Sequence, residues 1–414
     1  MMDLILRNGN LPDGRSGIDL GIDKGRIVAL TQNLEATALR EIDATGKLVS
    51  PPFVDAHFHL DSALTYGQPR INQSGTLLEG IALWAELKPT LTIDSMVARA
   101  LRYCELAISQ GLLAIRSHVD TSDARLLGVE ALLEVQQKVA PWLDLQLVAF
   151  PQDGLYRNRD GEHNLLRALD MGVNVVGGIP HFERTMHDGT RSVTRLLEIA
   201  ASRGLRADLH CDESDDPHSR HVETLAAETL RLGLQGRVAG SHLTSMHSMD
   251  NYYVSKLLPL MAESGVAAIA NPLINITLQG RHDTYPKRRG MTRVPELLAA
   301  GVPVAFGHDC VLDPWYSFGS ADMLEVAHMG IHVGQMTAQS AIHQAFEAVT
   351  TTPARILGLD DYGLAVGKSA DLLLLDAENV FHAIRTRADR LLVLRRGQIL
   401  LEQAPRTVQL NVHW

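Results

Sequence analysis

Eight short apolar runs recur along the middle of the chain, and each ends in polar residues. The runs cover residues 53–59, 112–120, 144–152, 173–180, 205–213, 237–244, 266–273 and 302–309. Segments with helical spacing of apolar residues lie between them, for example 94–110, 123–139, 192–203, 218–233 and 251–263. Strands that alternate with helices indicate a parallel sheet. Eight such units predict an α/β fold of the (β/α)8 barrel type, whose active site lies at the carboxyl ends of the strands.

The two ends of the chain follow a different pattern. Residues 2–50 and about 361–414 contain short alternating runs broken by Gly and Asp, such as 18–22, 26–30, 371–376 and 391–394. Runs of this kind are typical of strands. Neither end has enough strands to bury a face alone. We therefore expect residues 1–50 and 361–414 to form one small β-sandwich and residues 51–360 to form the barrel.

Composition narrows the class of protein and its partners. The chain has 414 residues, of which 45% are hydrophobic and 21% charged, as in ordinary globular proteins. Its 38 Lys and Arg residues against 48 Asp and Glu residues give a net charge of −10. No long basic block interrupts this acidic balance, so we expect no nucleic-acid partner.

The cysteines and the N-terminus bear on the compartment. The three cysteines, Cys104, Cys211 and Cys310, show no Cys-x-x-Cys spacing, which argues against a disulfide framework and a structural zinc site. The first residues do not resemble a signal peptide. No stretch approaches the roughly 20 apolar residues that span a bilayer. These features favour a cytoplasmic protein with no membrane partner.

Three of the apolar runs end in residues that suit a metal ion. His57 and His59 are one residue apart in a predicted strand, so their side chains face the same way. His210 and Asp309 end two later runs. One such histidine alone would more often be a hydrogen-bonded core residue, but their joint position at strand ends favours a ligand set. We predict one divalent metal ion, Zn²⁺ or Fe²⁺, on His57, His59, His210 and Asp309, with a position open for water.

Further residues could handle protons beside this ion. A bound metal lowers the pKa of water from about 15.7 to near 7, after which hydrolysis needs a group that carries a proton to the leaving group. Glu213 follows His210 by three residues and is the candidate, with a solvated loop acid as the alternative. His242 could hold or polarise the hydroxide, or be a buried hydrogen-bonded histidine. His118 also ends a run and is either a ligand or a residue that supports one.

Three residues could recognise a flat ring. Gln152 ends the third run, and its amide carries the donor and the acceptor that complement a ring nitrogen and its carbonyl. A structural loop glutamine is the alternative. Phe150 and Trp315 could form walls against the ring, although aromatic residues of this kind are often plain core.

These residues resemble the amidohydrolase superfamily and, within it, the bacterial cytosine deaminase family. The resemblance extends over nearly the whole chain and rests on long runs. Among them are PPFV at 51–54, GQP at 67–69, NQSGTL at 72–77, VAFPQ at 148–152, HCDE at 210–213, LQGR at 278–281, DTYPKRRG at 283–290 and DPWY at 313–316.

The resemblance implies roles for the candidate residues. It implies a single metal on the four ligands, protonation of a ring nitrogen by Glu213, handling of water by His242 and Asp309, and recognition of the ring's amide edge by Gln152. Binuclear members of the superfamily carry a carboxylated lysine at the end of the fourth strand. Here residues 175–181 read VVGGIPH, without a lysine. The resemblance also suggests a small-molecule pyrimidine substrate and a homo-oligomer.

Cys310 departs from the family pattern. In cytosine deaminases the metal-binding Asp is followed by a second Asp, whereas this chain has Cys310 after Asp309. If its side chain borders the ring, a carboxylate is replaced by a smaller, softer group. Relatives that accept 5-methylcytosine carry a small residue here.

We therefore expect hydrolytic deamination of cytosine or 5-methylcytosine to uracil or thymine plus ammonia, with Cys310 favouring the methylated base. One alternative keeps the mechanism and changes the ring to isocytosine, isoguanine or an aminotriazine. Another is a catalytically inactive scaffold of the same fold. The presence of all four ligands together with Glu213 argues against the scaffold.

Overall fold

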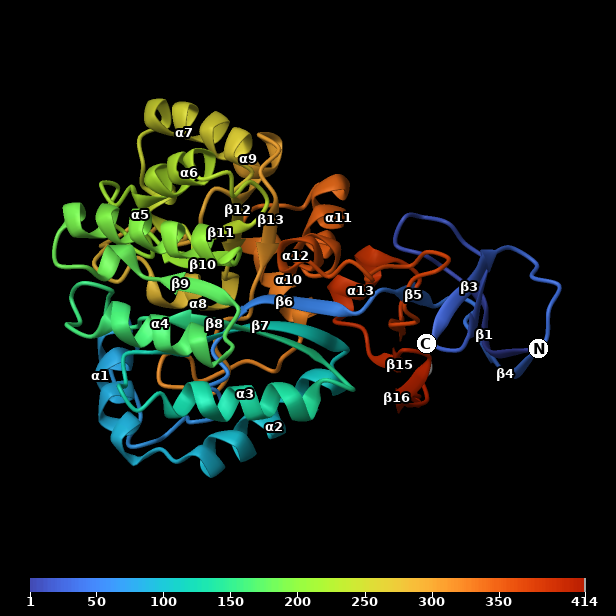
Figure 1. The fold of residues 1–414 in the computed structure, drawn as a ribbon. Helices are drawn as coiled ribbons and strands as arrows, with labels where there is room; N and C mark the ends of the chain where they lie inside the picture. The colour runs from blue at the N-terminus through green and yellow to red at the C-terminus, as the bar shows by residue number, and fades with distance from the viewer. Residues whose placement is uncertain (413–414) are drawn as a thin grey trace. The chain divides into compact units, whose positions relative to one another are not determined.

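The computed structural model describes residues 1–412, and the chain divides into two units. One unit comprises Met1–Pro52, Ile108–Gly111 and the segment from Asp361 onward. The other comprises Phe53–Ala107 and Leu112–Asp360, and it contains the barrel strands (Figure 1).

Eight parallel strands of the larger unit lie side by side in the order in which they occur along the chain. They are β6 (Phe53–Phe58), β7 (Leu112–Asp120), β8 (Asp144–Phe150), β9 (Val175–Gly178), β10 (Arg206–Cys211), β11 (Val238–His242), β12 (Ala267–Ala270) and β13 (Val304–Phe306). Each corresponds to one of the eight apolar runs. Their residues are buried almost throughout, as is typical of parallel strands covered by helices. The predicted (β/α)8 class is confirmed.

Backbone hydrogen bonds close the barrel between its first and last strands. A parallel bridge joins Phe58 to Asp309. The Asp309 N–H donates to the His57 carbonyl at 2.8 Å, and the His59 N–H donates to the Asp309 carbonyl at 3.0 Å. The closure therefore sets three of the four predicted metal ligands next to one another.

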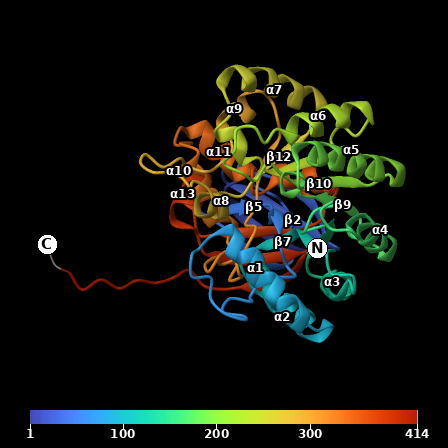
Figure 2. The same cartoon turned by 90° about the vertical axis from the view of Figure 1, so that its left-hand side faces the viewer.

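The helices of the larger unit lie around the outside of the strands (Figures 1 and 2). They are α1 (Leu77–Leu87), α2 (Ile93–Ser109), α3 (Leu127–Val139), α4 (Gly161–Met171), α5 (Met186–Arg203), α6 (His221–Arg231), α7 (Asn251–Ser264), α8 (Pro272–Leu278), α9 (Val294–Ala299), α10 (Met323–Val333), α11 (Gln339–Glu347) and α12 (Thr351–Leu357). Short 3₁₀ turns occur at Lys88–Thr90 (η1), Pro180–Phe182 (η2) and Thr244–His247 (η3). In residues 1–412, no helix is both long enough and apolar enough for a membrane span.

The smaller unit contains two four-stranded sheets. One consists of β1 (Met2–Gly9), β2 (Ile18–Asp23), β3 (Arg26–Thr31) and β4 (Ala38–Asp43). The other consists of β5 (Leu48–Ser50), β14 (Leu372–Leu375), β15 (Arg390–Arg395) and β16 (Gln398–Glu402), with α13 at Val380–Thr386. β5 pairs with β14, so both termini contribute to one sheet. A shared core, including Leu6, Ile22, Leu372 and Leu392, joins residues of both sheets as expected of a sandwich.

Candidate active site

A cavity of 80 Å³ lies at the carboxyl ends of the barrel strands. Most of the predicted site residues line it, namely His59, Gln152, His210, Glu213, His242, Asp309, Cys310 and Trp315. His57 is fully buried and contributes to the same cluster from behind the lining. The strand ends thus bring together residues that are more than 250 positions apart in the sequence.

The donor atoms of the four predicted metal ligands lie close to one another. Nε2 of His57 and Nε2 of His59 each lie 3.5 Å from Oδ1 of Asp309. Nε2 of His59 lies 3.0 Å from Nε2 of His210. Ligands with metal bonds near 2.1 Å in a tetrahedral site are roughly 3.4 Å apart. The spacing of the donors therefore fits a single divalent ion.

The protonation of these histidines fits the same ion. Burial lowers the pKa of His59 to about 4 and that of His210 well below its usual value, so both are neutral at pH 7. Neutral imidazole is the form that binds a metal. Nε2 of His57 is buried and has no hydrogen-bond partner among residues 1–412. A bound ion would satisfy this atom, which otherwise carries a desolvation cost.

His118 packs against the ligands without lining the cavity. The centroid of its ring lies 4.2 Å from that of His57 and 4.5 Å from that of His210. Burial lowers the pKa of His118 well below its usual value, so the ring is neutral.

The ring of His242 lies between two carboxyl groups. Its Nδ1 is 3.5 Å from Oε1 of Glu213, and its Nε2 is 3.8 Å from Oδ2 of Asp309. Asn275 determines the tautomer of His242. Its side-chain Oδ1 accepts a hydrogen bond from the backbone N–H of Asn271 at 3.1 Å. The NH₂ group of Asn275 therefore points to Nδ1 of His242, at 3.0 Å. Nδ1 must accept this hydrogen bond, so the proton of the neutral ring is on Nε2.

Asn275 is a site residue that the sequence analysis missed. It lies on α8, is fully buried, and follows Asn271 by one helical turn. Asn271 follows the last residue of β12, just as the predicted metal ligands lie at the ends of their strands. This position, together with the four-residue spacing of Asn271 and Asn275, is the sequence signal that could have identified the pair.

Glu213 reaches the cavity because the chain reverses at Asp212. Asp212 has a φ of 54°, and its carboxylate accepts the Val222 N–H at 2.8 Å and contacts Nδ1 of His221 at 2.7 Å. This turn lets both His210 and Glu213 line the cavity. Burial, and then the negative charge of Asp309, raise the pKa of Glu213 well above its usual range. A carboxyl group that keeps its proton at neutral pH can donate it.

The predicted ring-binding residues fall into two groups. Gln152 lines the cavity, and its side-chain amide makes no hydrogen bond to any of residues 1–412, so both its donor and its acceptor are available. Trp315 lines the cavity against α1, where an added Cβ on Gly80 would lie 2.3 Å from the indole Cδ1.

Phe150 does not line the cavity, which corrects its expected contact with the substrate. It is the last residue of β8 and is buried, and its ring stacks on His210 with centroids 4.0 Å apart and planes at 15°. The ring therefore supports a predicted ligand and does not form a wall for a substrate ring.

The side chain of Cys310 faces the cavity. It is 3% exposed, lines the cavity, and its Sγ lies 3.6 Å from Oδ1 of Asp309. The thiol therefore borders the space beside the predicted metal ligands.

An apolar wall completes the cavity, and the sequence analysis did not identify it. Its members are Leu77, Leu78 and Ile81 of α1, Ile179 and Phe182 near η2, and Ile274 and Leu278 of α8. His181, also in the lining, is buried and has its pKa lowered by burial to about 4. A flat apolar slot with a few polar groups at one end suits a small heterocycle.

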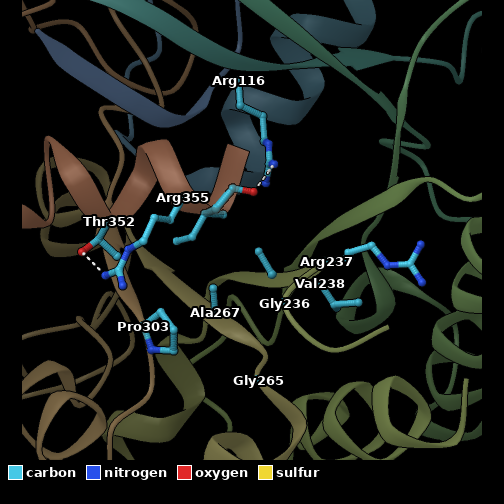
Figure 3. Close-up of a pocket in the computed structure, with 11 residues that line it drawn as sticks. Arg116, Gly236, Arg237, Val238, Gly265, Ala267, Pro303, Thr352 and Arg355 are labelled. Carbon is cyan, nitrogen blue, oxygen red and sulfur yellow. Dashed lines mark hydrogen bonds between the residues drawn. The ribbon is translucent and has the colours of Figure 1, made fainter. Parts of the chain in front are cut away.

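A larger cavity, of 210 Å³, lies at the opposite, amino-terminal end of the strands (Figure 3). Its lining includes Val238 and Ala267, which begin β11 and β12, and Thr352 and Arg355 of α12. It has no histidine, aspartate or glutamate in its lining. Its lining therefore lacks the kinds of side chain that could bind a metal ion or move protons in the carboxyl-terminal cavity.

Known proteins resemble this chain along nearly its full length. The model of the amidohydrolase family matches residues 40–401. The structure of 5-methylcytosine deaminase from Klebsiella pneumoniae liganded with 5-fluorocytosine is 41% identical, covers 98% of this chain and 99% of that chain, and has a TM-score of 0.96.

Two further relatives act on other compounds. N-isopropylammelide isopropyl amidohydrolase of Pseudomonas sp. (strain ADP) is 30% identical over 406 residues, which are 97% of each chain. Pterin deaminase of Rhizobium rhizogenes is 31% identical over 374 residues, 89% of this chain and 84% of that protein. These relatives, together with the His and Asp cluster, support metal-dependent deamination. The chain therefore belongs to the amidohydrolase family and is a deaminase-like hydrolase.

Proposed function

We propose that this protein deaminates a free pyrimidine base and accepts 5-methylcytosine at least as well as cytosine. Water replaces the exocyclic amine, so one C–N bond breaks, one C–O bond forms, and thymine or uracil is released with ammonia. The observation that carries the proposal is the position of Cys310, whose small side chain borders the cavity beside Asp309. The similarity to 5-methylcytosine deaminase supports it.

One divalent ion, Zn²⁺ or Fe²⁺, completes the proposed site on His57, His59, His210 and Asp309. Such an ion, when bound, supplies a hydroxide nucleophile at neutral pH by lowering the pKa of water. The spacing of the donors and the neutral state of His59 and His210 support this ligand set.

Glu213, His242 and Asp309 move the protons in the proposed reaction. Glu213 holds a proton at neutral pH, because its pKa is raised, and it gives this proton to the ring nitrogen beside the reacting carbon. His242 presents its Nε2–H toward Asp309, where it can hold the attacking oxygen. One hydrogen of the water replaces the proton that Glu213 has given to the ring nitrogen, and the other ends on the departing amine, so Glu213 is protonated again after each turnover.

Gln152 and the apolar wall determine which ring is bound. The free amide of Gln152 can pair with the ring carbonyl and an adjacent ring nitrogen. A methyl group on carbon 5 adds on the order of 0.8 kcal/mol of binding where the pocket has room for it. The thiol of Cys310 leaves that room without requiring a charge to be desolvated.

A second candidate is deamination of another aminated ring, such as isocytosine, isoguanine or an aminotriazine. The observation that favours it is the 30% identity to N-isopropylammelide isopropyl amidohydrolase over 97% of each chain. An inactive scaffold is disfavoured, because the four donors and the buried Glu213 gather around one cavity.

An ammonia-release assay with metal-replete protein over a panel of aminopyrimidines, isoguanine and aminotriazines tests the proposal. The highest kcat/KM is expected for 5-methylcytosine, with cytosine equal or below. A clear preference for isoguanine or a triazine would replace the pyrimidine assignment. Absence of ammonia from every compound would support the scaffold.

A further inference from the structure

We propose that Arg116, Asp208 and Ser241 form a buried relay that holds His57 in the tautomer able to bind a metal ion. The relay lies inside the barrel, between the predicted metal ligands and the cavity at the amino-terminal end. The three residues touch neither the substrate cavity nor the reacting atoms, so they are positioning residues. This inference rests on the proposed role of His57 as a ligand.

The relay is a continuous chain of short hydrogen bonds. Nδ1 of His57 lies 2.9 Å from Oγ of Ser241, and this hydroxyl donates to Oδ1 of Asp208 at 2.6 Å. Nη1 of Arg116 donates to Oδ2 of Asp208 at 3.0 Å. All four side chains are at most 1% exposed, so water does not compete for these bonds.

The direction of each hydrogen bond follows from the number of hydrogens available. A serine hydroxyl has one hydrogen, and a carboxylate can only accept, so the Ser241 hydrogen points to Asp208. Oγ of Ser241 must then accept from His57, which places the imidazole hydrogen on Nδ1. Nε2 of His57 keeps its lone pair, is otherwise without a partner among residues 1–412, and lies 3.5 Å from Oδ1 of Asp309.

Arg116 anchors the far end of the relay through an ion pair with Asp208. Its guanidinium donates to Asp208, to Oε1 of Gln146 at 2.7 Å and to the Ile356 carbonyl of α12 at 3.1 Å. Figure 3 shows the last of these bonds at the edge of the amino-terminal cavity. Loss of this guanidinium would leave the buried carboxylate of Asp208 without its charged partner.

Strand geometry explains why the relay and the ligands occur together. Asp208 precedes His210 by two residues on β10, so both side chains face the barrel interior, one layer apart. Ser241 pairs with His210 in register on the neighbouring strand β11. Strands β10 and β11, which carry His210 and His242, therefore also carry Asp208 and Ser241, the residues of the relay that hold His57.

The metal affinity of variants in the relay tests its proposed role directly. Ser241→Ala removes the acceptor for His57, and we expect metal to bind about 10- to 100-fold more weakly in competition with a chromophoric chelator. Asp208→Asn should weaken binding at least as much. Its amide oxygen would face Arg116 and its NH₂ group would face Ser241, so the hydroxyl would donate to His57 Nδ1 and place the ring proton on Nε2.

Tautomer spectra give a second readout that does not depend on activity. In metal-free protein with ¹⁵N-labelled histidines, the His57 signal, assigned through a His57→Asn variant, should show a proton on Nδ1 in the wild type. Asp208→Asn should move this proton to Nε2.

Two controls separate the relay from general damage and from the ligand assignment. Ser192→Ala removes a buried hydroxyl of α5 whose one hydrogen bond within residues 1–412 is to the Gly189 carbonyl at 2.8 Å, and it should leave metal affinity unchanged. Thermal unfolding of the metal-free variants reports folding. If His57→Ala binds metal as well as the wild type, the ligand assignment fails. If His57→Ala loses metal while folded Ser241→Ala and Asp208→Asn bind within twofold of the wild type, the relay is overturned and the ligand set stands.

Discussion

Glu213 is the residue on which the proposed proton transfer depends. It is buried in the cavity, and its pKa is raised by burial and by Asp309. We expect Glu213→Gln to retain metal and to lower turnover about a hundredfold or more, since general acid catalysis typically contributes that much. Kinetics on 5-methylcytosine together with metal analysis of the same sample check this. Wild-type turnover in a metal-loaded Glu213→Gln protein would remove Glu213 from the mechanism.

Cys310 is the residue on which the substrate preference depends. Its Sγ borders Asp309, and the nearby Asp313 is so buried that its pKa is raised to about 7. An aspartate at position 310 would add a third carboxylate beside those of Asp309 and Asp313. It would crowd a 5-methyl group of the substrate and would require desolvation of another charge. Cys310→Asp should therefore shift the ratio of the two kcat/KM values toward cytosine.

The matched control is Cys310→Ser, which keeps a small uncharged side chain and should keep the preference of the wild type. The assay compares cytosine and 5-methylcytosine with all three proteins. A ratio that Cys310→Asp leaves unmoved would show that this position does not select the base.

Single residues differ in how far the sequence predicts them. The alternation of side chains along a strand was sufficient to select His57 and His59, whose Nε2 atoms lie equally far from Oδ1 of Asp309. The direction of Cys310 depends on the backbone after β13, and the role of Asn275 depends on a helix that packs across the cavity. Local spacing encodes neither the direction of Cys310 nor the contact of Asn275 with His242, although the spacing from Asn271 marks Asn275 as a candidate.

At the scale of elements, the loop after β8 is held by one carboxylate. Glu183, which follows η2, accepts the backbone N–H groups of Leu155 at 2.6 Å, Tyr156 at 3.1 Å and Arg157 at 2.8 Å. The same loop begins with Gln152, which we propose forms hydrogen bonds with the carbonyl and a nitrogen of the substrate ring. The buried Leu155 N–H and the part-buried N–H groups of Tyr156 and Arg157 would lose their acceptor in Glu183→Ala. The cost is about 1–3 kcal/mol for the buried group before relaxation or entry of water, and less for the other two.

We expect Glu183→Ala to raise KM several-fold more than it lowers kcat, because it displaces a binding group and leaves the ligands untouched. Steady-state kinetics separates the two parameters. Glu134→Ala is the control, since Glu134 pairs with Lys138 at 2.6 Å along α3. Equal KM values in Glu183→Ala and the wild type would show that the loop does not position Gln152.

Elements also differ in how far the sequence predicts them. The eight strands and helices such as α2 and α7 have a clear period, and the structure contains them within a few residues of the expected bounds. The sequence pattern did not predict helix α1, because apolar residues lie on two of its faces. Leu83, Trp84 and Leu87 are buried, whereas Leu77, Leu78 and Ile81 line the cavity. Apolar residues on both faces weaken the helical periodicity on which prediction relies.

At the scale of the whole molecule, the proposed metal ion ties together distant parts of the barrel. His57 and His59 come from the first strand, His210 from the fifth, and Asp309 from the segment that closes the ring. A ligand that binds only the folded state adds about 4 kcal/mol of stability at a thousandfold excess over Kd. Chelation should therefore lower Tm and abolish activity, and both should return when the ion is restored.

The ligand variants extend this prediction. His57→Ala and Asp309→Ala should lose metal and activity together and should show no change of Tm on chelation. Metal content and thermal unfolding, each with and without chelator, check the outcome. Full metal occupancy in both variants would contradict the ligand set.

The central claim is that a metal-dependent deaminase site has room for a methyl group beside Asp309. The most direct test is the ratio of kcat/KM for 5-methylcytosine to kcat/KM for cytosine, measured by ammonia release with the metal-replete wild-type protein. A ratio of one or more is predicted, because Cys310 leaves space and adds no charge. A protein at least tenfold more efficient on cytosine, or one that releases ammonia from neither base, would contradict the claim.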